Sequence, residues 1–382
     1  MSSIQALRAR LEKISSEIVL QEKLLHQLRR EKTLAQRQLN EAVDPVARLP
    51  LEISSEIFLQ CLAPFPGQKP AGDRAPLLLL NICSAWTAIA LSTPRLWSAV
   101  VIDFSCPEVS TQLLPTWLQR AGKHPLSISL RRNFCSHHIP TIVWLYRDQL
   151  KELEIVHEED NSESDDLEDE SSRILDLFGD ATPEPLPLLE TLIVRNEVEY
   201  RGLLAPQILQ LLRLAPNLVN YTYSSTFLDD LSIPSEKPIH STLRTLTFGS
   251  RGSPPDPDEG ILSCLSFPAL TDLSVDLRLS GCSIFAFLKR QPTPALRDLV
   301  LGMTDYNAPD SVELHECLNL IPSLVRFEMW CPRPRHLVQF CTNLADSPSF
   351  LPNLRTLTIY LSLTTSDSCW GVPTSCAFDP PH

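Results

Sequence analysis

A short apolar motif recurs along most of this chain of 382 residues and constrains its fold more than any other feature. The motif is Leu-x-x-Leu-x-apolar, usually with a proline two residues before the first leucine. Alternate apolar positions predict a short strand with one buried face. One such strand cannot bury its own apolar face, so the copies are expected to stack into a curved α/β solenoid. The eight copies begin at Leu150, Leu189, Leu218, Leu243, Leu270, Leu296, Leu324 and Leu354.

The spacing of the copies locates an insertion. Their starts are separated by 39, 29, 25, 27, 26, 28 and 30 residues, and the longest gap contains residues 158–170, with nine acids and no base. A run of this composition is too polar to fold and predicts a solvated acidic loop inside one repeat. Ser162, which is followed by acids, is a candidate phosphorylation site for an acidophilic kinase, although a plain spacer is the simpler interpretation.

The N-terminal residues follow a different period. Over residues 3–42, apolar side chains alternate three and four apart, with no glycine or proline, which predicts a coiled-coil helix ended by Asp44-Pro45. Gln21 and Lys32 are polar exceptions on this seam. Three interpretations stay open: self-association, a different coiled-coil partner, or a helix packed back on its own protein. The seam consists of Ile4, Leu7, Leu11, Ile14, Ile18, Gln21, Leu25, Leu28, Lys32, Ala35, Leu39 and Ala42.

A second helical unit is expected over residues 46–104. Ile53, Ile57 and Phe58 fall at helical spacing and predict an apolar ridge just after Leu49-Pro50. A Pro/Gly loop at 63–76 precedes a second helix, which Thr93-Pro94 stops. The second helix is expected to place Leu79, Ile82, Cys83, Trp86, Ile89 and Ala90 on one face.

Residues 49–97 resemble the F-box, in the form common among fungal F-box proteins with a heptad helix in front. The combination of a Leu-Pro-x-Glu-Ile start, a spaced tryptophan and a Pro-x-Leu-Trp ending carries the resemblance. The loop at 63–76 is longer than the family pattern. The matching residues are Leu49, Pro50, Glu52, Ile53, Ile57, Phe58, Trp86, Pro94, Leu96 and Trp97.

Residues 147–361 resemble degenerate leucine-rich repeats, without the asparagine or cysteine that normally follows each strand. Together the two resemblances imply a substrate receptor of a cullin–RING (SCF-type) ubiquitin ligase. Its F-box would bind a Skp-type adaptor, and its repeats would bind a protein substrate. The expected domains are a coiled-coil helix (1–44), an F-box (46–104), a repeat domain (124–365) and a tail (366–382). The alternative is a coiled-coil interaction scaffold without a ligase role.

The expected contact residues follow from the same patterns. The adaptor is expected to touch Leu49, Pro50, Ile53 and Ile57, whereas Trp86 and Trp97 are expected to fill the unit's own core. Substrate is expected on the strand face between the apolar positions, where aromatics and arginine are favoured anchors. That candidate surface comprises Asp272, Asp276, Asp298, Arg326, Glu328, Trp330 and Tyr360.

Other classes of function find no support in the composition. The sequence contains no catalytic or nucleotide-binding motif, so no enzyme activity and no cofactor are expected. Cys135 with His137 and His138 lacks a second ligand pair for a metal. There is no basic patch for nucleic acid and no apolar run long enough for a membrane. The eleven cysteines form no regular framework, which favours reduced, mostly buried thiols and an intracellular, cytoplasmic or nuclear location.

Overall fold

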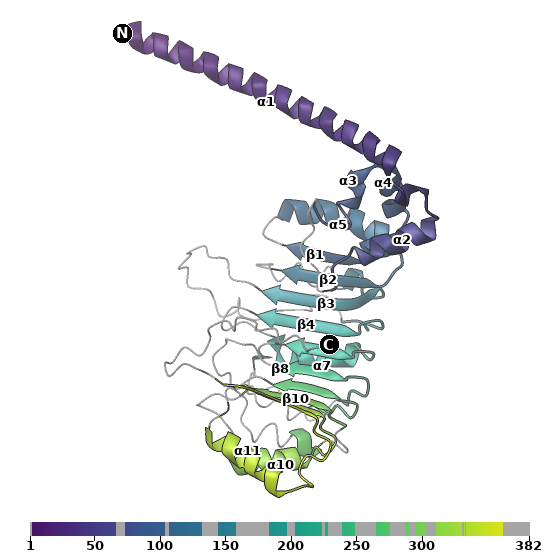
Figure 1. Cartoon of the computed structure of the whole chain (residues 1–382), viewed down its shortest axis with the longest axis vertical. Helices are drawn as coiled ribbons and strands as arrows, with labels where there is room; N and C mark the ends of the chain where they lie inside the picture. Colours follow the sequence, from purple (N-terminus) through teal and green to yellow (C-terminus); the bar gives the residue numbers. More distant parts are fainter. Residues whose placement is uncertain are drawn as a thin grey trace. The chain divides into compact units, whose positions relative to one another are not determined.

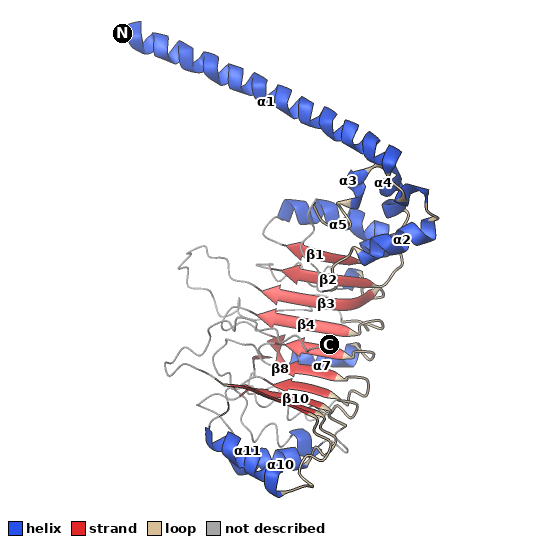
Figure 2. Ribbon diagram, viewed as in Figure 1, coloured by secondary structure: helices blue, strands red, loops and turns tan. Residues whose placement is uncertain are grey.

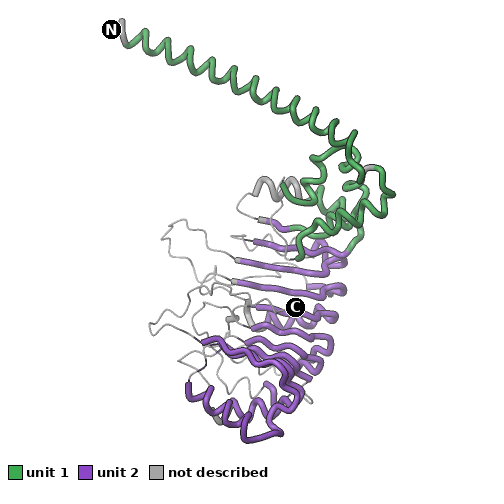
Figure 3. Tube along the Cα trace, in the orientation of Figure 1, with its two compact units in different colours: residues 1–100, 113–124 green, residues 101–112, 125–382 purple. Residues whose placement is uncertain are grey.

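The computed structural model forms two compact units (Figure 3). The first comprises residues 1–100 and 113–124, and the second comprises residues 101–112 and 125–382. The acidic run 158–170, with Ser162, and the Cys135–His138 cluster lie outside the described residues, as do Asp276 and the tail. The structure describes residues 2–65, 73–103, 107–131, 144–157, 183–196, 203–223, 226–227, 239–248, 265–275, 287–290, 295–302, 311–330, 332 and 334–361.

The first unit begins with one long helix, α1 (Ser2–Val43), which covers the predicted heptad segment (Figure 1). Residues 4–36 are exposed throughout, and partial burial begins only at Arg37. The last turns of α1 contact the rest of the unit: Arg37 Nη2 donates to Thr87 Oγ1 (3.1 Å), and Asn40 Nδ2 donates to the carbonyl of Ile82 (3.0 Å). The helix is therefore anchored at its C-terminal end alone, and the predicted seam does not pack back onto described parts of the chain.

A small helical body follows α1. It consists of a 3₁₀ turn η1 (Val46–Arg48), α2 (Leu51–Gln60), α3 (Leu79–Ile82), α4 (Ser84–Leu91) and η2 (Pro94–Trp97). The sequence predicted α3 and α4 as one helix, which was wrong. The buried Cys83 is extended (φ −156°, ψ 175°) and breaks it, and the Thr87 hydroxyl bonds to the carbonyls of Leu80 and Cys83 (both 2.9 Å) next to the break. Thr93-Pro94 stops the second helix as predicted.

The second unit is built on an open parallel sheet of ten strands (Figure 2). The strands of this sheet lie side by side in chain order. Each neighbouring pair from β2 to β12 is parallel. The strands are β1 (Ala99–Asp103), β2 (Leu126–Arg131), β3 (Leu150–His157), β4 (Thr191–Asn196), β6 (Asn220–Tyr223), β8 (Thr245–Phe248), β9 (Asp272–Val275), β10 (Asp298–Gly302), β11 (Arg326–Trp330) and β12 (Thr356–Tyr360).

One backbone contact repeats at the start of successive strands. The amides of Asp272, Asp298 and Arg326 each donate to a carbonyl just before the preceding strand, at 2.9 to 3.1 Å. The same bond links Thr356 to the carbonyl of Val325 (3.1 Å). This repetition keeps the strands in register, so that equivalent motif positions lie side by side, as Leu273, Leu299 and Phe327 do.

The predicted motif positions form the core of this unit. In the first seven copies all three apolar positions are buried, as with Leu299, Phe327 and Met329, each of which is fully covered. The eighth copy differs: Leu357 is 37% exposed and Ile359 is half-buried. These side chains are less buried because β12 is the last strand of the sheet, and no described strand lies beyond it to cover them.

Shorter elements complete the second unit. Phe340 of α11 (Pro334–Asp346) packs on Phe327 of β11, with ring centres 5.4 Å apart. Beside it, His315 of α10 (Ser311–Asn319) bonds to Asn343 (2.7 Å). The other elements are α7 (Ala205–Leu214) and a two-stranded sheet of β5 (Leu203–Leu204) and β7 (Thr226–Phe227). The helix α5 (Pro107–Ala121) is divided between the units, and its residues from 113 onward belong to the first. Within the described ranges, no helix is both long enough and apolar enough to cross a bilayer.

Candidate functional site

The four predicted adaptor-contact residues lie together at the start of α2. Leu49 and Pro50 are both extended (ψ 155° and 145°), and Pro50 immediately precedes the helix. Pro50 occupies the N-cap position, one residue before the first turn of α2. The Pro50 carbonyl accepts hydrogen bonds from the amides of Ile53 and Ser54 (both 3.1 Å), so the proline still starts the helix.

One face of α2 packs into the helical body. Ser54 and Phe58 are fully buried on that face. The Ser54 hydroxyl donates to the carbonyl of Val46 (3.1 Å), and the Phe58 ring lies 4.7 Å from the ring of Trp86. The sequence grouped Phe58 with the outer ridge, which was wrong. Phe58 lies one residue, or about 100°, past Ile57 around the helix and so points into the body.

The neighbouring side of α2, about 100° around the helix, leaves apolar side chains open. Leu49, Ile53 and Ile57 are 41%, 51% and 40% exposed, and they follow one another at every fourth residue. Ile53 and Ile57 are four apart on α2 and so lie on one side, one above the other, whereas Leu49 lies in the extended segment just before the helix. We call Leu49, Pro50, Ile53 and Ile57 the α2 ridge. Since Ser54 and Phe58 fix the helix from behind, the α2 ridge is presented on a rigid support.

The two tryptophans of the segment support the body from inside. Trp97 is fully buried, and its indole N–H donates to the carbonyl of Ala90 (2.9 Å). Its ring meets Trp117 edge-on at 5.0 Å. Trp86 is half-buried, stacks obliquely on Phe58, and donates its indole N–H to the Asp44 carboxylate at the end of α1. The expectation that both fill the core is confirmed for Trp97 and confirmed in part for Trp86.

The predicted substrate-contact residues are brought together on one face of β9 to β12. The strand register places Asp272, Asp298 and Arg326 in one row across three strands. Arg326 Nε lies 2.6 Å from Asp298 Oδ1. Four residues further along the strands, Trp330 and Tyr360 form another row, with stacked rings 4.2 Å apart. We call this set, with Glu328, the β9–β12 face.

Bonds within the β9–β12 face hold several of these side chains. The indole N–H of Trp330 donates to Glu328 Oε1 (2.6 Å), and Thr271 Oγ1 donates to Asp272 Oδ2 (2.6 Å). The face therefore combines carboxylates at one end of the strands with a stacked aromatic pair at the other.

A polar cluster on β2 to β4 was not anticipated. Glu154 is fully buried, and its Oε2 accepts from the Ser129 hydroxyl (2.6 Å) and from Arg131 Nη2 (3.3 Å). Arg195 Nη1 lies 3.9 Å from the other carboxylate oxygen. In the sequence, the only signal was a glutamate between two motif positions, which is indistinguishable from an exposed strand residue.

Metal-ligating side chains and cysteines occur across the described residues. Among the described residues, no three His, Cys, Asp or Glu side chains cluster closely enough to hold a metal ion. Four cysteines are described, all free: Cys83 and Cys317 are buried, and Cys61 and Cys341 are exposed. Burial raises the pKa of Cys317 to about 12, which keeps this thiol protonated and unreactive.

Comparison with known proteins adds no relative: no family model matches this chain, and no curated protein matches it. The candidate site therefore stands on its geometry. Two surfaces meet the requirements for protein binding, namely the α2 ridge in the first unit and the β9–β12 face in the second.

Proposed function

We propose that this chain is a substrate receptor of a cullin–RING (SCF-type) ubiquitin ligase. Residues 46–104 act as an F-box that binds the Skp-type adaptor, and the sheet unit acts as an irregular leucine-rich-repeat solenoid that binds a protein substrate. The chain itself catalyses no reaction. It brings the substrate to the ligase by two separate contacts.

The observation that carries the proposal is the exposure of the α2 ridge. A helix face with three half-exposed aliphatic side chains in a line, backed by buried Ser54 and Phe58, is suited to packing against helices of another protein. If these residues only stabilised the chain's own fold, they would be covered, as Phe58 and Trp97 are. The open face therefore favours a partner at this position.

The order of the strands supports the second half of the proposal. Parallel strands that pair in chain order, with motif starts 25 to 30 residues apart in most gaps, are expected of stacked repeats. Repeat proteins of this kind bind partners on a continuous surface formed by neighbouring repeats. The β9–β12 face, with its stacked Trp330–Tyr360 pair and Arg326, is the proposed substrate surface.

A binding measurement with purified Skp-type adaptor tests the adaptor contact. The double variant Ile53→Ala, Ile57→Ala removes two exposed side chains of the α2 ridge without touching the buried face. Truncating central anchors of an interface commonly costs about 2 kcal/mol or more, which is about 30-fold in Kd. We expect at least that loss in calorimetry or surface plasmon resonance.

A matched control lies on the same helix. Glu52 and Glu56 are also exposed on α2 but point away from the line of Ile53 and Ile57, so Glu52→Ala, Glu56→Ala should bind as the wild type does. If both double variants bind the adaptor equally well while remaining folded, the F-box assignment is wrong. The scaffold function without a ligase role then becomes the better explanation, because the exposed seam of α1 remains.

A further inference from the structure

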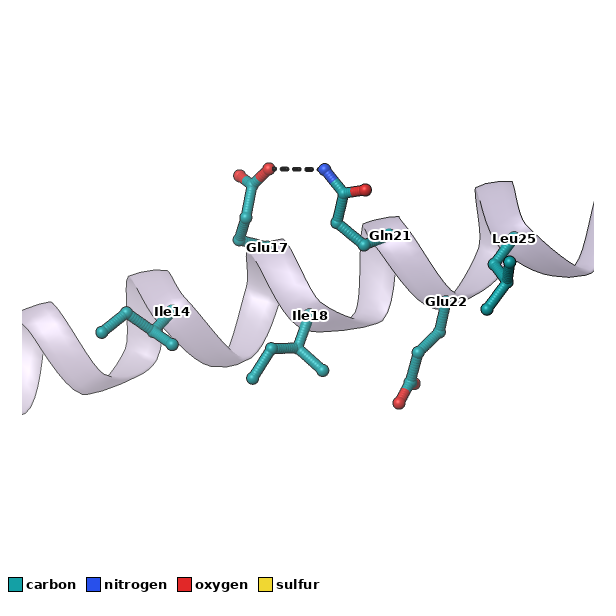
Figure 4. Close-up of a pocket in the computed structure, with 6 residues that line it drawn as sticks. All are labelled: Ile14, Glu17, Ile18, Gln21, Glu22 and Leu25. Atoms are coloured by element: carbon teal, nitrogen blue, oxygen red, sulfur yellow. Dashed lines mark hydrogen bonds between the residues drawn. The ribbon is translucent and has the colours of Figure 1, made fainter.

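The apolar seam of α1 is left uncovered along most of its length within the described residues. Its leucines and isoleucines are between 48% and 67% exposed, from Ile4 to Leu39. Figure 4 shows Ile14, Ile18 and Leu25 along the helix, while the side chain of the seam residue Gln21 turns toward Glu17 and donates a hydrogen bond to it (3.3 Å). Soluble proteins rarely leave a continuous apolar strip of this length open.

The chain's own contacts with α1 leave this strip free. Arg37, Asn40 and Glu41 make the hydrogen bonds that anchor the end of α1 to α3 and α4, at 2.5 to 3.1 Å. With 3.6 residues per turn, these three lie between about 130° and 170° around the helix from the line through Leu39 and Ala42. The helical body therefore holds α1 from the side opposite the seam, and the seam stays open up to its last heptad.

We propose that α1 pairs along this seam with α1 of a second copy of the chain, forming a two-stranded coiled coil. The available area suits such a pair. A helix of 42 residues is about 63 Å long, and a contact strip about 10 Å wide covers about 600 Å² on each copy. The total of about 1,200 Å² reaches the range of stable, specific interfaces.

The charges beside the seam are balanced in sign, although Glu17 and Glu22 would face each other if two copies paired in parallel. The flanking positions carry three arginines and three glutamates, so the strip has no net charge of one sign: Arg8, Arg10, Glu17, Glu22, Arg29 and Glu31. A coiled coil that selects a different partner usually carries one sign of charge at these positions and meets the other sign there. Gln21 and Lys32 interrupt the apolar seam, and such polar positions limit the number of strands and the register.

The test is the mass of the full chain in solution. Light scattering after size exclusion should give twice the mass of one chain for the wild type. The variant Leu11→Glu, Ile18→Glu places two charges on the seam and should run as a monomer. The control Ala9→Glu, Ser16→Glu carries the same added charge and the same spacing on the opposite side of α1, and it should remain dimeric.

A second measurement identifies the occupant. Two copies with different affinity tags, expressed together, should co-purify when the seam is intact and separate in the Leu11→Glu, Ile18→Glu variant. Circular dichroism of each variant confirms that the helix content is retained. A monomeric wild type, a complex of three or more copies, or a dimer that survives the seam variant in folded form would each overturn the proposal.

Discussion

At the scale of single residues, Glu154 has the least expected environment. Its carboxylate is buried in the sheet unit and bonds to the buried hydroxyl of Ser129 and to Arg131. A buried acceptor that serves several donors is costly to remove, because the donors then lose a partner they cannot replace with water. Glu154 therefore holds the polar side chains of β2 to β4 in place, as the buried leucines hold the apolar face of the strands.

Replacement of Glu154 tests this role. We expect Glu154→Ala to lower the free energy of unfolding by about 1–3 kcal/mol, since the Ser129 hydroxyl is left buried without its acceptor. The matched variant Glu152→Ala removes an equivalent bond from the less buried Ser127 (2.7 Å) and should cost less. Urea denaturation of the two variants provides the comparison, and equal costs would show that burial of Glu154 is unimportant.

Cys317 and Cys341 allow a chemical test on adjacent helices. The thiolate is the reactive form of cysteine, and burial raises the pKa of Cys317 to about 12. At pH 8 iodoacetamide should therefore modify the exposed Cys341 and leave Cys317 intact. Mass spectrometry of the digested protein measures both sites. Rapid labelling of Cys317 would mean that α10 opens readily.

At the scale of secondary-structure elements, burial differs sharply between equivalent strands. Leu299 of β10 and Leu357 of β12 occupy the same motif position, yet Leu299 is fully buried and Leu357 is 37% exposed. Leu299→Ala should destabilise the sheet unit by about 2–5 kcal/mol, as buried leucine truncations do. Leu357→Ala should cost about 1 kcal/mol or less, because less apolar surface is lost. If the denaturation midpoint falls equally for both variants, the conclusion that β12 is a less buried edge strand is wrong.

The elements that could be predicted are those with a strong period. Twofold alternation located eight strands of the ten-stranded sheet, and the heptad located α1, because each pattern reports directly which side of the element is apolar. Those strands are β3, β4, β6, β8, β9, β10, β11 and β12. The break at Cys83 and the inward turn of Phe58 could not be predicted. Both depend on how short helices pack against each other, and local spacing does not encode that contact.

The candidate sites also contain residues that could be predicted from the sequence and residues that could not. The exposure of Ile53 and Ile57 followed from helical spacing, and the rows of Asp298, Arg326 and Trp330 followed from strand alternation. The Glu154 cluster was missed, because its partners Ser129 and Arg195 come from two other strands. Cross-strand partners become visible only once the register is known.

At the scale of the whole molecule, most of α1 can be removed without disturbing the rest. None of residues 4–36 is buried, so a chain that begins at residue 35 keeps the anchoring side chains Arg37, Asn40 and Glu41. We expect this truncation to leave the unfolding transition and adaptor binding unchanged, while the dimer is lost. Thermal denaturation measures the unfolding transition, and light scattering measures the loss of the dimer.

A longer truncation provides the contrast. A chain that begins at residue 42 also loses the hydrogen bonds to Thr87, Ile82 and Ser84. Its helical body should melt at a lower temperature than that of the shorter truncation. If both truncated chains melt together, the end of α1 does not stabilise the body.

The sheet is assembled in the order in which its strands are read, so each strand depends on its immediate neighbours in that series and on no distant segment. The connection that holds the acidic run shows that one linker can lengthen while the flanking strands β3 and β4 still pair. Duplication of a single unit, or growth of a single connection, is therefore tolerated by such an architecture. The molecule is open to change one unit at a time.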